Sequence, residues 1–173
     1  MRSTSYKLLN AVYESIQGRL GHYNIFCMTR NNKNAIQDFR NSPNGVLFAS
    51  GAMWEGVDFA GDCLSSVIIP RLPFPIRGGM SQQKKEQYKD AQDFIWKYVV
   101  PEMVTKLRQG VGRLIRTETD TGVVSILDVR AYQGMYKGKV AGVLQKYPAI
   151  HSVEEVQRFF RSVKPQEYFY DEA

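Results

Sequence analysis

The chain has 173 residues, of which 43% are hydrophobic and 23% are charged, and its formal net charge is +6. This length and balance are typical of one soluble globular domain with a sizeable core, which excludes a disordered or fibrous protein. No apolar run approaches the roughly 20 residues that span a bilayer, and no signal peptide is visible. We therefore expect a cytoplasmic protein, or a nuclear one if the source is eukaryotic. The positive charge is compatible with a nucleic-acid partner but does not require one.

The two cysteines, Cys27 and Cys63, lack the spacing of a disulfide framework or a zinc site. We expect both to be reduced core residues. No metal site is predicted in this chain.

The first helix is predicted over 5–20, where apolar residues recur at helical spacing. Ser3, Thr4 or Ser5 can cap its start. The residues before Thr4 are too few and too polar for a complete apolar strand. Two explanations stay open: the chain begins inside a domain, or a central strand is missing.

Short strands are predicted at 23–28 and 45–49, with a brief helix at 35–39 between them. The second strand opens into a glycine-rich loop with acidic residues at its far end, S-G-A-M-W-E-G-V-D-F-A-G at 50–61. A strand that opens into such a loop is typical of a ligand-binding edge on a parallel sheet. Taken alone, W-E-G-V-D-F is equally compatible with a plain surface turn.

A third strand is predicted at 64–69, and the segment P-R-L-P-F-P at 70–75 follows it on an extended path. A fourth strand is predicted at 123–128. Helices are predicted at 82–100, 101–116 and 131–147, and from 152 onward with a Ser152–Glu155 capping box. This alternation of strands and helices predicts an α/β fold with a mainly parallel sheet covered on both faces.

The strongest candidate for a functional site is Q-G-V-G-R-L-I-R at 109–116. In a helix, Gln109, Arg113 and Arg116 share one stripe, with Gly112 beside it, and the apolar residues gather on the opposite face. Each guanidinium is a permanently charged fork that matches phosphate oxygens. For this stretch alone, the alternative of a surface helix with two solvated arginines is favoured.

Further motifs support the phosphate interpretation. Q-G-V-G-R-L-I-R followed by D-x-G-V-V-x-I-L-D-x-R resembles motif VI of superfamily 2 helicases, in the form carried by the DinG/XPD branch. The W-E-G-V-D loop resembles motif V, a similar L-P-F segment follows it in that family, and Thr4-Ser5-Tyr6 resembles the end of motif IV. The resemblance covers about 4–147, in the family's order.

This resemblance implies that 1–173 is a single domain, the second, three-layer RecA-like domain of an ATP-dependent DNA helicase that acts in DNA repair or replication. Within it, motif IV is a remnant at 4–6, motif V lies at 49–61 and motif VI at 109–116, and 164–173 is expected to be a flexible tail. The resemblance implies that Arg113 and Arg116 stabilise charge on the transferred γ-phosphoryl group and that Gln109 helps to orient it. The residues implied in the ATP site or its coupling are Glu55, Gly56, Asp58 and Gly112, and those implied in DNA contact are Ser5, Ser50 and Gly51. For Ser5, a plain helix cap is an equally good interpretation.

The sequence contains no Walker A segment and no credible Walker B segment. ATP and Mg²⁺ are therefore expected to be bound mainly by a first domain outside this chain, and the chain alone is expected to be inactive. An iron–sulfur cluster, which family members carry in that first domain, has no ligands here. The expected partners are that first domain and single-stranded DNA, with no membrane. The alternative is a non-enzymatic nucleic-acid or protein-interaction module that keeps the helicase fold.

Overall fold

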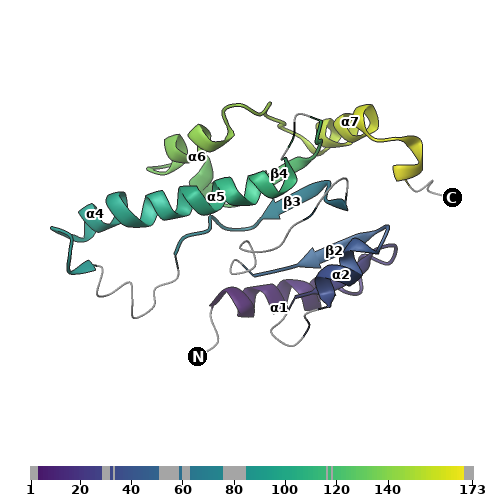
Figure 1. The fold of residues 1–173 in the computed structure, drawn as a ribbon, viewed down its shortest axis with the longest axis horizontal. Coiled ribbons are helices and arrows are strands. Elements are labelled where there is room, and N and C mark those ends of the chain that lie inside the picture. The colour runs from purple at the N-terminus through teal and green to yellow at the C-terminus, as the bar shows by residue number, and fades with distance from the viewer. Residues whose placement is uncertain are drawn as a thin grey trace. The chain divides into compact units, whose positions relative to one another are not determined.

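The computed structural model describes residues 4–28, 32, 34–50, 59, 63–75, 85–115, 117 and 119–169 (Figure 1). The chain divides into two compact units, Met1–Phe59 and Ala60–Ala173. Each unit contains one pair of parallel strands. The interpretation of 1–173 as a single domain stays a prediction.

The first unit contains α1 (Thr4–Ile16) and the strands β1 (Asn24–Cys27) and β2 (Gly45–Phe48), which are connected through α2 (Ala35–Arg40). The strands pair in parallel, with Asn24 opposite Gly45. Phe39 of α2 is buried, and its ring meets the ring of Phe59 edge-on at 5.6 Å. A Cβ at Gly45 would lie 2.6 Å from the Phe39 ring, so only glycine allows α2 to lie this close to β2. Both strands confirm the predictions.

The second unit contains the strands β3 (Ser66–Ile69) and β4 (Val123–Ile126), which pair in parallel with Ser66 opposite Val123. The connection between them carries α4 (Ala91–Phe94), the π-helix η3 (Ile95–Val99) and α5 (Val100–Leu114). The last part of the unit contains η4 (Val129–Ala131), α6 (Lys137–Leu144), α7 (Val153–Val163) and η5 (Gln166–Tyr168).

The core of the second unit lies between α5 and the β3–β4 pair. One face of α5 is buried, as its apolar spacing predicts, and its buried side chains include Met103, Leu107, Val111 and Leu114. Ile69 of β3 and Ile126 of β4 are buried as well. Parallel strands connected through helices give the chain the predicted α/β class.

The predicted helix at 82–100 is wrong over 86–90, which form turns. The carboxylate of Asp90 accepts a hydrogen bond from the Asp93 N–H at 2.8 Å and so starts a new helix at Ala91. From there α4, η3 and α5 continue to Leu114 without a break, and the predicted boundary at Pro101 does not exist. Pro101 lies in the first turn of α5, where the wider π-turn of η3 precedes it.

The predicted helix at 131–147 is wrong over 132–136 and over 145–147, which form turns. Helix η4 ends at Ala131, Gly134 then takes a left-handed conformation with a φ of +75°, and α6 begins only at Lys137. The capping box before α7 is half confirmed. The Glu155 N–H donates to Ser152 Oγ at 3.2 Å, but the Glu155 carboxylate accepts from the His151 N–H, at 2.7 Å, in place of the Ser152 N–H.

The C-terminal segment packs against its own unit as far as Phe169. Lys164 is buried, the Tyr168 ring stacks on Phe160 with ring centroids 6.1 Å apart, and the Tyr168 hydroxyl shares a hydrogen bond with the hydroxyl of Ser65. Residues 170–173 lie outside the described ranges, and the flexible tail at 164–173 stays a prediction.

Candidate functional site

The exposed end of α5 carries the polar stripe that the sequence predicts. Gln109 and Gly112 are exposed and Arg113 is half-buried, whereas Gly110 and Val111 are buried on the opposite side. A Cβ at Gly112 would have no neighbour within 4 Å, so the space beside the stripe is open. The helix ends at Leu114 and Ile115 is extended, with φ −115° and ψ 104°, so the helix ends two residues before the predicted end at 116. Arg116 lies outside the described residues.

A close backbone approach fixes this end of α5 against the sheet. A Cβ at Gly122 would lie 2.6 Å from Leu114 Cδ1 and 2.8 Å from the carbonyl oxygen of Ser65. Glycine therefore allows the end of α5 to lie on the amino-terminal ends of β3 and β4. In the preceding turn, the Thr117 N–H donates to the Asp120 carboxylate at 2.9 Å. Arg113 is thus held near the amino-terminal ends of β3 and β4.

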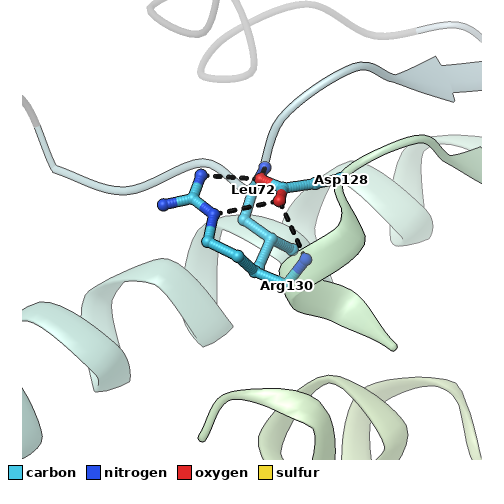
Figure 2. Close-up of polar contacts among 3 residues, drawn as sticks. All are labelled: Leu72, Asp128 and Arg130. Atoms are coloured by element: carbon cyan, nitrogen blue, oxygen red, sulfur yellow. Dashed lines mark hydrogen bonds and ion pairs between the residues drawn. The ribbon is translucent and has the colours of Figure 1, made fainter. Parts of the chain in front are cut away.

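The opposite edge of the same sheet carries a second polar cluster, centred on Asp128. Its carboxylate accepts hydrogen bonds from the Leu72 N–H at 2.8 Å and from the Arg130 N–H at 3.1 Å (Figure 2). The Arg130 guanidinium adds bonds from Nε at 2.9 Å and from Nη2 at 2.7 Å. The Asp128 side chain is only 6% exposed, and the Arg130 bonds hold the pKa of Asp128 down at about 2 in spite of its burial.

The Arg130 guanidinium also lies over the ring of Phe74, with Cζ 4.8 Å from the ring centroid. Phe74 in turn meets Tyr136 edge-on at 5.1 Å, and Tyr136 lies 6.3 Å from Trp96 of η3. These contacts hold the L-P-F segment to the end of β4. A carboxylate bound by four donors at neutral pH is a positioning group, and it is not suited to act as a general base.

Asp128 and Arg130 lie two residues apart at the end of the fourth predicted strand. The contacts with Leu72 and Phe74 were not foreseen. The spacing D-x-R at a strand end suggests that the guanidinium binds the carboxylate two residues before it. Only the fold brings this pair into contact with Leu72, 56 residues before Asp128.

The other predicted site residues are not brought together by the described structure. Ser5 lies in the first turn of α1, inside the helix. Ser50 is 4% exposed, and its hydroxyl has no hydrogen-bond partner among the described residues. Gly51, Glu55, Gly56 and Asp58 lie outside the described residues. The roles of all these residues stay predictions.

Two features are absent from the described ranges. No group of three or more His, Cys, Asp or Glu side chains among these residues is arranged to hold a metal ion. None of the helices in the same ranges is long and apolar enough to cross a membrane. Both cysteines are free thiols, and burial raises the pKa of Cys27.

Comparison with known proteins places these features in a family. A family model described as a helicase C-terminal domain matches residues 2–147. The chain is 32% identical over 150 residues to the 3'-5' exonuclease DinG of Staphylococcus saprophyticus and 30% identical over 150 residues to that of Staphylococcus aureus strain MSSA476. It is 32% identical over 152 residues to the protein of that name from Staphylococcus epidermidis. Each of these matches covers 83% of this chain but only 16% of the relative's length.

Proposed function

We propose a function from one premise: this chain belongs to the helicase C-terminal domain family, in the branch that contains DinG. In the whole protein it is the second RecA-like motor domain of an ATP-dependent DNA helicase. Its two parallel strand pairs belong to one three-layer domain with helices on both faces. A first domain, outside this chain, holds ATP and Mg²⁺.

The end of α5 acts on that ATP. Arg113 and Arg116 reach the γ-phosphoryl group as it is transferred, and Gln109 orients the site. Two observations support this role: the exposed stripe of α5 keeps Gln109 and Gly112 uncrowded, and the Gly122 contact holds this end of the helix rigidly on the sheet. A rigid support matters because stabilisation of a transition state requires charge that is already in place.

Other residues of the chain bind the single-stranded DNA. Ser5, Ser50 and Gly51 contact the backbone of single-stranded DNA, and Glu55, Gly56 and Asp58 connect these contacts to the ATP site. Since Ser50 is 4% exposed, its hydroxyl becomes available to a phosphate only if its surroundings move when the strand binds. Opening and closing of the cleft between the two domains then moves the strand contacts and drives translocation.

The observation that carries the proposal is that the family match over residues 2–147 includes 109–116, the segment whose Gln109 and Gly112 are exposed on one end of α5. The test uses the whole parent protein and measures DNA-stimulated ATP hydrolysis. Arg113→Ala and Arg116→Ala should each lower kcat by about a thousandfold or more, because they remove charge stabilisation in the transition state. The apparent ATP affinity should change much less.

Lys106→Ala is the matched control, because it removes a cation from the same helix that is paired with Glu102 at 3.1 Å. It should leave kcat within about twofold, as expected for a surface substitution. Arg113→Lys should rescue poorly, since an ammonium group cannot reproduce the planar fork. Thermal unfolding separates loss of catalysis from loss of structure. A near-normal kcat in well-folded variants of both arginines would refute the proposal.

A further inference from the structure

A cleft of about 290 Å³ lies between α5 and α6 in the second unit, and of its lining residues only Gly112 has been given a role above. The residues that line it include Arg108, Gly112, Ile115, Gly142, Lys146 and Tyr147. Gly142 and Lys146 come from α6 and the residues just after it, so two elements build the cleft. Its volume is at the low end of the range for small-molecule pockets.

The two glycines of the cleft are not explained by the packing around them. Gly112 and Gly142 both lie inside helices, where a glycine is less favourable than alanine by about 1 kcal/mol. Neither has the left-handed φ that favours glycine, which among the described glycines belongs to Gly134 alone. A Cβ at either position would have no neighbour within 4 Å. Their effect is to leave helix backbone without side chains at two places in the lining of the cleft.

The two cations of the cleft differ in their pairing from Lys97 of η3 and Lys106 of α5. Lys97 and Lys106 pair with carboxylates four residues before them, at 2.7 and 3.1 Å. Arg108 has no acidic residue three or four positions away, and the described structure records no ion pair for it or for Lys146. The Lys146 ammonium lies over the Tyr147 ring, 5.4 Å from its centroid.

The charge of a helix end does not account for Arg108. A cation stabilises the carboxyl end of a helix only from the last turn, and Arg108 lies more than one turn before Leu114. Lys146, just beyond α6, fits that explanation, but Arg108 does not. The cleft thus combines an unpaired guanidinium, a second cation and open backbone.

We propose that this cleft binds the phosphodiester backbone of a single-stranded nucleic acid. Arg108 and Lys146 contact phosphate oxygens, and the sugar–phosphate chain passes over Gly112 and Gly142, where a side chain would block it. The small, open cleft suits a chain that passes through it better than a free nucleotide that needs enclosure. The inference rests on the proposed function in one respect only, namely that the protein works on a nucleic-acid strand.

The experiment measures binding of a fluorescent oligothymidylate to the 173-residue chain without ATP, at several salt concentrations. Arg108→Ala and Lys146→Ala should each weaken binding by at least about threefold and reduce the salt slope by about 0.7, the value for one lost phosphate contact on a single strand. Gly142→Leu should weaken binding to a similar extent without any change of charge, because it adds a large side chain to the lining of the cleft. Lys106→Ala should bind like the wild type.

Thermal unfolding of each variant identifies any that fails to fold. Well-folded Arg108→Ala and Lys146→Ala chains that bind no more weakly than Lys106→Ala would overturn the proposal, and so would a Gly142→Leu chain that binds like the wild type. Titrations with ATP and with polyglutamate test other anions. If Arg108→Ala abolished binding of one of these and left oligonucleotide binding intact, the ligand would be that anion and the proposal would be wrong.

This outcome is separate from that of the arginine experiment. The binding assay contains no ATP and does not involve Arg113 or Arg116. A normal kcat in the variants of those two residues would end the proposed motor role and leave the strand contact standing.

Discussion

Arg130 donates two hydrogen bonds to the carboxylate of Asp128, only two residues before it, from Nε at 2.9 Å and Nη2 at 2.7 Å. The same carboxylate accepts the backbone N–H of Leu72, which follows the neighbouring strand. One buried side chain therefore ties together the two segments that leave the carboxyl ends of β3 and β4. The charge of the carboxylate is balanced within the cluster, and this is why it tolerates burial.

Asp128→Asn should destabilise the chain by about 2 kcal/mol. The amide has one acceptor oxygen in place of two and carries no charge for the Arg130 fork, so the Leu72 N–H or the guanidinium loses its partner. Urea unfolding measures this. The control is Glu102→Gln, which weakens a partly exposed ion pair on α5 and should cost under about 1 kcal/mol. Equal urea midpoints for the two variants would mean that the Asp128 contacts do not stabilise the fold.

The Asp128 carboxylate should make the stability of the chain fall as the pH is lowered. Its pKa is lowered from 3.8 to about 2 in the folded chain, chiefly by the Arg130 hydrogen bonds. Its contribution to stability is fully present above about pH 4 and is lost as the pH falls towards 2. Urea unfolding between pH 5 and pH 2 should therefore show a smaller loss of stability in Asp128→Asn than in the wild type. If the two chains lost the same amount of stability between pH 5 and pH 2, the lowered pKa of Asp128 would be contradicted.

Gly122→Ala should destabilise the chain by about 1–3 kcal/mol, as overpacking does in a close contact. The new Cβ would meet the Leu114 side chain at 2.6 Å and the Ser65 carbonyl oxygen at 2.8 Å, and the backbone atom cannot move aside alone. Gly138→Ala is the matched control, because Gly138 lies in α6 with nothing within 4 Å of its Cβ position. It should stabilise the chain by about 0.4–1 kcal/mol. A Gly122→Ala chain as stable as the wild type would show that α5 does not depend on this contact.

The strands were the most predictable part of the fold. Each is a short run of mostly apolar residues bounded by polar or turn-forming residues, so β1 to β4 lie where the sequence predicts them, within one or two residues. Helix boundaries were less predictable, because 86–90 contain no proline or glycine that would mark a break, and 132–136 contain only Gly134. The Asp90 cap and the left-handed Gly134 decide the outcome there, and both are local effects that spacing does not reveal.

For the candidate site, the sequence predicts the polar stripe at Gln109 and Arg113, because a helix fixes which residues share a face. It does not predict the Leu72–Asp128 contact or the Arg108–Lys146 cleft. Both depend on how segments distant in the sequence meet, which no local pattern encodes. The role of Arg113 depends in addition on a domain that this chain does not contain.

The two parallel strand pairs differ in how far apart their strands lie along the chain, and this has a consequence for folding. β1 pairs with β2 across the short connection from Cys27 to Gly45, whereas β3 must find β4 across the connection from Ile69 to Val123. A connection about three times longer raises the entropic cost of closure by only about 1 kcal/mol, but folding slows as contacts become less local. We expect the β1–β2 pair to gain protection from amide hydrogen exchange before the β3–β4 pair during refolding. On a ribosome the same order follows from the direction of synthesis, because β2 emerges long before β4.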